Sequence, residues 1–134
     1  MDEIRSRLNK AKEALSYAYA AYDAQQYSKC FSRLFQTVYN ICFAYAYAKQ
    51  GRTSGSYKIF HLVRVDLIRT HLIPEQLSDT LSDIQHFHFN HIVIEDLVDV
   101  DEEAQYQLSN VLLLYTSVSE YLFIHADSLL AHNN

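Results

Sequence analysis

The sequence has very few of the residues that interrupt regular secondary structure. Among its 134 residues there are two glycines and one proline. Strand-rich domains need frequent tight turns and use glycine and proline to make them, so a chain this poor in both is not expected to form a sheet. We therefore expect an all-α fold of a few long helices in a single domain, residues 1–134.

Lysine and arginine are absent from the chain beyond Arg69. All 11 basic residues lie at or before Arg69, and residues 1–71 hold 5 of the 16 acids, a formal charge of +6. Residues 72–134 hold the other 11 acids, a formal charge of −11. Such a division favours self-association between unlike faces, or one basic patch on an acidic surface. It disfavours an extended nucleic-acid interface, and no DNA binding is expected.

Three further absences narrow the class of protein. The only cysteines, Cys30 and Cys42, are too few and too far apart for a zinc or redox motif, so we expect buried, reduced thiols in a cytoplasmic protein. The N-terminal residues have no signal-peptide pattern and no apolar run reaches membrane-spanning length, so no membrane association is expected. There is also no glycine-rich phosphate loop and no nucleophile elbow, and no cofactor is expected.

The segment from Gln26 to Gln50 is apolar around most of its circumference. Apolar residues recur every three or four positions in two neighbouring stripes, one over 27–45 and one over 35–47. A helix of this kind must be covered on more than one side, so it is predicted to be the central helix of a bundle. Its polar residues predict a stripe that is either a narrow solvent seam or a dimer or ligand groove. The stripe consists of Ser32, Arg33, Gln36, Thr37 and Asn40.

The same periodicity and the few helix breakers predict the elements around the central helix. Asp99 with Glu102 three residues later resembles a capping box for the last helix. The predicted elements are a helix from Asp2 to about Ala24, a loop over Gly51–Ser56, a helix over Tyr57–Leu72, a helix beginning near Pro74, an extended connection over Ile92–Val98, and a long last helix.

Three stretches of the chain resemble the HEPN domain of prokaryotes. The stretch YSKCFSRLFQTVYNICFAYAYAKQG is similar to the family's segment of small residues, an arginine and paired aromatics that runs into a glycine. The stretch KIFHLVRVDLIRTHLI is similar to the region after that loop, and IEDLVDVDEEAQYQL to the approach to the last helix. The resemblance covers nearly the whole chain as a pattern of residue classes.

The resemblance implies an up-and-down bundle of four to five helices that forms a homodimer. Many relatives are metal-independent ribonuclease toxins, paired with a nucleotidyltransferase-type antitoxin, whose active site is an arginine and a histidine a few residues apart. The place expected for this pair is Gln85–His91, where Asn90 and His91 stand without an arginine. The nearest pair with a fitting spacing is Arg64 with His71, on the third predicted helix.

The candidate catalytic residues are therefore Arg64, His71 and His91. Arg64 and His71 are two helical turns apart, about 10 Å, so they could act on one phosphate only if a second subunit contributed. The guanidinium would then bind the phosphate and the imidazole would transfer a proton. The alternative is a solvated helix face on which Arg64 pairs with a neighbouring acid.

The densest group of imidazoles is His86, His88 and His91. A helix would place His88 and His91 on one face, and a strand would place His86 and His88 on one face. Either arrangement supplies two ligands where zinc needs more, so no metal site is expected. We favour a substituted remnant of the family's site in a dimer groove, with His86, His88 and Asn90. His125 lies on the apolar stripe of the last helix and is expected to be a hydrogen-bonded core residue.

Three functions remain open on the sequence. The leading hypothesis is a HEPN-like homodimer that has lost or altered its Arg/His ribonuclease site and acts through protein, nucleotide or RNA contacts, in a toxin–antitoxin or defence system. The second is an active metal-independent ribonuclease toxin that uses Arg64 with His71 or His91. The third is a structural helical adaptor without a ligand.

Overall fold

The protein is helical throughout the residues that its computed structural model describes, 2–51 and 58–133, and these ranges contain no strand. The predicted all-α fold is thus confirmed for this part of the chain. The elements are α1 (Asp2–Asp23), α2 (Tyr27–Gln50), α3 (Lys58–Arg69), α4 (Gln76–Phe89), the short 3₁₀ helix η1 (Ile94–Asp96) and α5 (Val100–Asn133).

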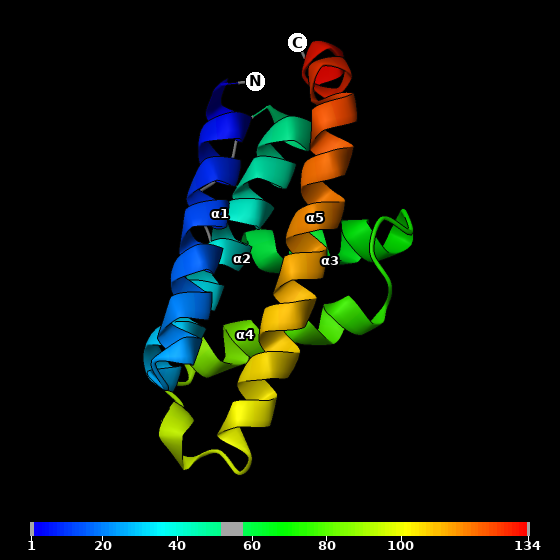
Figure 1. Ribbon diagram of the computed structural model, residues 1–134. Coiled ribbons are helices and arrows are strands. Elements are labelled where there is room, and N and C mark those ends of the chain that lie inside the picture. The colour runs from blue at the N-terminus through cyan, green and yellow to red at the C-terminus, as the bar shows by residue number, and fades with distance from the viewer. Residues whose placement is uncertain (1, 52–57, 134) are drawn as a thin grey trace.

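The three long helices run along one another, and the two shorter ones lie across them (Figure 1). The start of α1 and the end of α5 lie at the same end of the bundle, so these two helices are antiparallel (Figure 1). Helix α2 packs against every other element, which confirms its prediction as the central helix. The expected bundle is present, with α2 as the helix that the others cover.

The core forms around two helices with complementary side chains. Half of α2, 12 of its 24 residues, is buried. Helix α1 contributes small side chains to the same core, which allows the two backbones to approach closely. The buried small residues of α1 are Ala11, Ala14, Ala18 and Ala21. Cys30 and Cys42 are free and buried, as predicted, and burial raises the pKa of both thiols to about 12. They therefore remain protonated and unreactive at neutral pH.

Most helices of this chain end without glycine. Gly51 ends α2 in the left-handed conformation, with φ of 73°, and its N–H donates to the carbonyl of Tyr47. Gln25, His71 and His91 take the same conformation after α1, α3 and α4, with φ of 60°, 58° and 50°. After each of these three residues, the next N–H bonds a carbonyl five residues before it, as in a Schellman motif. With two glycines available, the chain uses other residues where glycine is normally favoured.

The structure corrects the predicted elements at three places. Helix α3 ends at Arg69 rather than at Leu72, and Tyr57 lies outside the described residues, as do residues 52–56 of the predicted loop. The connection predicted to be extended contains the 3₁₀ turn η1 instead. The capping box does not form: Asp99 has φ of 56°, and it is its carbonyl that accepts from the N–H of Glu103. A side-chain cap needs an extended backbone at that position.

Candidate functional site

Four of the five residues of the predicted polar stripe of α2 border two clefts, one on each side. The fifth, Thr37, is buried instead, and its Oγ1 donates to the carbonyl of Arg33 at 2.8 Å. The first, which we call the α1–α2 cleft, has a volume of about 240 Å³. The second, the α2–α4 cleft, has a volume of about 190 Å³. The α1–α2 cleft is lined by Lys10, Glu13, Ala14, Tyr17, Arg33, Gln36 and Asn40. The α2–α4 cleft is lined by Ser28, Phe31, Ser32, Phe87, His88, His91, Ile92 and Ile94.

Arg33 is held in a fixed orientation in the α1–α2 cleft. Its Nη1 donates to Oε1 of Gln36 at 3.0 Å, and its guanidinium lies 5.0 Å from the centre of the Tyr17 ring. No ion pair joins Arg33 to any residue that the structure describes. The side chain therefore presents an uncompensated positive charge whose position is set by an amide and an aromatic ring.

Two hydrogen bonds hold the side chain of Asn40 at one end of the α1–α2 cleft. Asn40 donates from Nδ2 to the carbonyl of Gln36 at 2.9 Å, and its Oδ1 accepts from Nη1 of Arg7 at 3.3 Å. The guanidinium of Arg7 lies 3.8 Å from the centre of the Phe43 ring. The amide of Asn40 is thus bonded at both ends. The predicted groove residues Arg33, Gln36 and Asn40 all line this one cleft.

His88 forms the wall of the α2–α4 cleft. Its ring is stacked on Phe35, with centroids 3.6 Å apart and planes 9° from parallel. Burial, helped by the nearby charge of His91, holds the pKa of His88 below its usual value. The imidazole is therefore neutral at physiological pH, and it adds an aromatic surface rather than a charge.

His86 and Asn90 do not line either cleft. They lie on the exposed end of α4, where Nδ2 of Asn90 is 2.6 Å from Nδ1 of His86. The residues predicted to form one groove thus lie in three places. Arg33, Gln36 and Asn40 line the α1–α2 cleft, His88 lines the α2–α4 cleft, and the other two lie at this end of α4. No group of three potential metal ligands occurs among residues 2–51 and 58–133.

The candidate catalytic residues occupy separate positions. Arg64 lies on α3, where its Nη2 is 3.3 Å from Nδ1 of His61 one turn earlier. His71 and His91 are the left-handed residues that follow α3 and α4. Within the described part of the chain, no hydrogen bond joins Arg64 to either histidine. Of these three, His91 lines the α2–α4 cleft.

Glu95 closes the start of α2, a contact that the sequence analysis did not anticipate. Both oxygens of its carboxylate accept from Oγ of Ser28, at 2.6 and 2.7 Å, and Oε1 also accepts from the Ser28 N–H at 3.2 Å. These hydrogen bonds hold the pKa of Glu95 below its ordinary value. Gln26, the residue before α2, makes no side-chain cap, so η1 supplies the cap from elsewhere in the chain. In the sequence, Glu95 is an acid within the connection predicted over Ile92–Val98, and nothing in the pattern indicates which helix it contacts.

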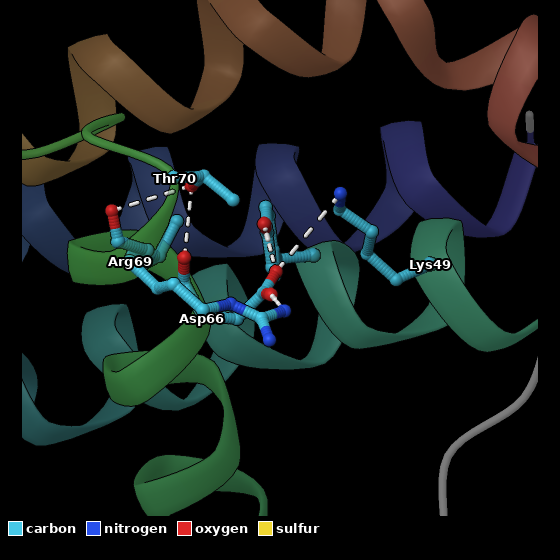
Figure 2. A network of polar contacts seen from close by, with 6 residues as sticks. Lys49, Asp66, Arg69 and Thr70 are labelled. Atoms are coloured by element: carbon cyan, nitrogen blue, oxygen red, sulfur yellow. Dashed lines mark hydrogen bonds and ion pairs between the residues drawn. The ribbon is translucent and has the colours of Figure 1, made fainter.

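A second polar network, also missed, joins three helices at the end of α2 (Figure 2). Asp66 of α3 accepts a short hydrogen bond from the Tyr45 hydroxyl and another from Arg69 Nη2 at 2.8 Å, and Lys49 Nζ lies 3.9 Å away. Figure 2 shows the Lys49 and Arg69 side chains directed toward Asp66. Lys49 also lies over the ring of Tyr121 on α5, 5.7 Å from its centre.

The carboxylate of Asp66 is the centre of this network. Burial alone would raise its pKa, but the bonds from Tyr45 and Arg69 and the charge of Lys49 outweigh burial and lower the pKa below its usual value. Burial, together with the bond to Asp66, raises the pKa of Tyr45. Asp66 is thus ionised and Tyr45 protonated at neutral pH. The network is an attachment of α3 to the bundle.

The prediction for His125 was wrong. The residue is exposed, and its ring packs against Tyr121 with centroids 4.6 Å apart. Val118 and Leu122 on the same stripe are buried, so the cover that the other helices give this side of α5 does not extend to His125.

No protein-family model matches the chain, and no curated protein is similar to it. Among the described helices, none has the length and apolar composition needed to cross a membrane.

Proposed function

We propose that the chain is a HEPN-like helical protein that has lost cleavage chemistry and acts by binding RNA or a nucleotide. One observation carries the first half of this proposal. His91 stands where the family resemblance expects the catalytic histidine, and no lysine or arginine is among the described residues that line its cleft. Cleavage of a phosphodiester without a metal needs a fixed cation, because negative charge develops on the phosphate oxygens in the transition state.

The geometry of the candidate histidines supports the same conclusion. His71 and His91 are helix-ending residues whose backbone conformation is part of a structural motif. Arg64, the only arginine with a fitting spacing, has its guanidinium next to His61 on its own helix. An active site would require a second subunit to bring Arg64 to His91, and each side chain would have to leave its present position.

The binding half of the proposal rests on the α1–α2 cleft. Tyr17 offers an aromatic ring that is 49% exposed, and Arg33 and Lys10 offer positive charge next to it. Single-stranded RNA is typically bound by stacking of bases on aromatic rings, with cations on the phosphates and amides on the base edges. Gln36 supplies such an amide, and Glu13 can accept hydrogen bonds from ribose hydroxyls.

The cleft also explains how a chain with a net charge of −5 could bind a polyanion. Lys10 and Arg33 line the cleft together with one acid, Glu13, and neither cation is ion-paired with a described residue. The cleft thus carries two cations and one anion, a local excess of positive charge on a chain whose total charge is negative. The resemblance further suggests a nucleotidyltransferase-type antitoxin as a partner, in a toxin–antitoxin or defence system.

Cleavage and binding are tested separately with the full chain. Total RNA is incubated with the wild type and with Arg64→Ala, His71→Ala and His91→Ala, with EDTA present, and we expect no degradation above background in any of them. Degradation by the wild type that disappears in Arg64→Ala and in one histidine variant would show an active ribonuclease and refute the first half of the proposal.

Binding is measured by fluorescence anisotropy of a short labelled single-stranded RNA at low and moderate salt. We expect Arg33→Ala and Tyr17→Ala each to weaken binding by about tenfold, since each removes a phosphate contact or a stacking surface. Lys12→Ala is the matched control, because it removes the same charge from the side of α1 that faces away from the cleft. Equal losses in Arg33→Ala and Lys12→Ala would indicate only nonspecific attraction.

A further inference from the structure

The register of α1 against α2 determines which side chains face one another across the α1–α2 cleft. The two helices are antiparallel (Figure 1). At one end Nη1 of Arg7 donates to Oδ1 of Asn40, and at the other the Arg33 guanidinium lies over the ring of Tyr17. From Arg33 to Asn40 the rise along α2 is about 10 Å, so the space between the two contacts is about two helical turns long.

Glu13 and Gln36 lie between these two contacts, roughly level with each other. Glu13 belongs to α1 and Gln36 to α2, and both line the cleft. A carboxylate and an amide are therefore on opposite walls of one cleft. Glu13 is exposed, and it forms neither an ion pair nor a hydrogen bond with a described residue. Both of its oxygens are free to accept hydrogen bonds from a ligand.

The amide of Gln36 is oriented by Arg33. Its Oε1 accepts from Nη1 of Arg33 at 3.0 Å, and a guanidinium has only donors, so the amide oxygen must be on the side of Arg33. The Nε2 group keeps two N–H donors that no described residue uses. Gln36 therefore offers a donor to a molecule in the cleft, and Glu13 offers two acceptors.

Two acceptors opposite a donor match the Watson–Crick edge of guanine. Guanine carries two neighbouring donors, N1–H and N2–H₂, beside the acceptor O6. A carboxylate can accept from both donors while an amide donates to O6. Adenine and cytosine offer one donor group on this edge, and uracil offers one donor between two acceptors. Each of these three bases would thus use only one oxygen of Glu13.

We propose that the α1–α2 cleft selects guanine, with Glu13 accepting from N1–H and N2–H₂ and with Nε2 of Gln36 donating to O6. This inference rests on the proposed function, because it names the base that the same cleft takes from an RNA or a nucleotide. It assigns Glu13 to the base rather than to a ribose. Tyr17 and Arg33 supply the stacking surface, and Lys10, one turn before Glu13 on α1, supplies a cation for a phosphate.

The base preference is measured by fluorescence anisotropy on the full chain. The probes are short labelled uridine tracts, either unsubstituted or with one guanosine, adenosine, cytidine or inosine at the centre. We expect the guanosine tract to bind about tenfold more tightly than the uridine, adenosine and cytidine tracts, the discrimination of one bidentate contact. Inosine lacks the N2 amino group, so its tract should bind more weakly than the guanosine tract.

Glu13→Gln separates base recognition from overall charge. Removing an acid from the cleft should by itself strengthen the attraction for any polyanion. If Glu13 binds the base, the same change should instead weaken binding of the guanosine tract by about tenfold, because an amide offers only one acceptor. Glu102→Gln is the control, since it removes the same charge from an exposed position on α5 that does not line the cleft. Circular dichroism verifies that both variants fold.

The outcomes distinguish this inference from the proposed function. Tracts that all bind equally and all lose affinity in Arg33→Ala would overturn the choice of guanine but leave RNA binding by the cleft in place. A guanosine preference that persists in Glu13→Gln would also overturn it, because the base would then be recognised elsewhere. No binding of any tract would refute both.

Competition with GMP and AMP identifies the source of the base. Displacement of the guanosine tract by GMP at comparable concentration would indicate a free nucleotide as the ligand, and displacement only by a large excess would indicate a strand. Either result supports guanine, provided that AMP displaces the tract less well than GMP. Equal displacement by the two nucleotides would contradict the assignment of Glu13 and Gln36 to the base.

Discussion

Helices α2 and α5 are the two most extensively apolar segments of the chain, yet they end in different environments. Helix α2 packs against every other element and keeps its apolar side chains covered. Helix α5 packs on α2, α1 and α4 and leaves five large apolar residues in solvent. The difference lies in the neighbours: α3 and α4 are short and lie across the bundle (Figure 1), so they cover α2 fully and α5 only in part.

The exposed polar residues are distributed differently on the two helices. In α2 the exposed polar residues gather in one strip between α1 and α4, which leaves the rest of the circumference for the core. In α5 the polar residues Ser109, Thr116 and Glu120 alternate with exposed apolar ones on the same side. A helix whose apolar face is buried keeps its polar and apolar residues on separate sides. An exposed face on which polar and apolar residues are mixed is typical of a protein–protein contact surface.

The largest effect is expected from matched truncations in the two helices. Leu34→Ala removes a side chain of α2 that is 0% exposed and should lower the free energy of unfolding by about 2–5 kcal/mol. Leu113→Ala removes the same atoms from a side chain of α5 that is 43% exposed, and it should cost less than about 1 kcal/mol in the monomer. Urea unfolding followed by circular dichroism measures both. Equal losses in dilute solution would show that α5 is covered within one chain.

A smaller effect is expected where α2, α3 and α5 meet. Asp66→Asn removes the charge that Arg69 and Lys49 face and weakens the acceptor of the Tyr45 hydroxyl, so it should destabilise the fold by about 1–3 kcal/mol. Tyr45→Phe should cost less, because Asp66 keeps its basic partners. The double variant should lose less than the sum of the two, since both changes remove the same bond.

The effect of Asp66→Asn should also depend on pH. The pKa of Asp66 in the folded chain lies below its ordinary value of 3.8, so the ionised form stabilises the fold above that pH. This contribution is lost as the pH falls through the folded pKa. The stability difference between wild type and Asp66→Asn should therefore be constant near neutral pH and shrink below about pH 4. A difference that grew on acidification would contradict the assigned network.

The smallest effect concerns how the helices end. His91→Gly should stabilise the fold by about 0.5–1 kcal/mol, because a residue with a Cβ is disfavoured at its φ of 50°. His91→Ala keeps the Cβ and should change little. Gly51→Ala, at the end of α2, should destabilise the fold by about 1 kcal/mol, because it introduces a Cβ at a φ of 73°. If His91→Gly destabilised the fold instead, the imidazole would hold a contact that outweighs its backbone conformation. Thermal unfolding at neutral pH resolves differences of this size.

Much of the fold follows from local pattern, because helical periodicity is a property of neighbouring residues. The bounds of α1 and α2 agree with prediction within one residue. The predictions of the elements were wrong where tertiary contacts or the turn after a helix determine the local structure. The connection after α4 folds into η1, which allows Glu95 to cap α2, and α3 ends early because His71 turns the chain.

The candidate site was predictable where it lies on one helix. Arg33, Gln36 and Asn40 are neighbours on α2 by helical geometry alone, and they do line one cleft. Tyr17 and Lys10 were not identified, because the register of α1 against α2 is set by packing and not by sequence spacing. The division of His86, His88 and Asn90 among different surfaces has the same cause.

The sequence by itself determined that the chain is helical, which helix is central, and that no basic residue follows Arg69. These properties depend on residue type and spacing, which act within a few turns of one segment. Only the tertiary structure decided which apolar residues stay exposed, that Asp66 collects Tyr45, Arg69 and Lys49, and that His125 is not in the core. Burial and pairing depend on what a different helix places opposite a side chain, and spacing along one helix does not contain that information.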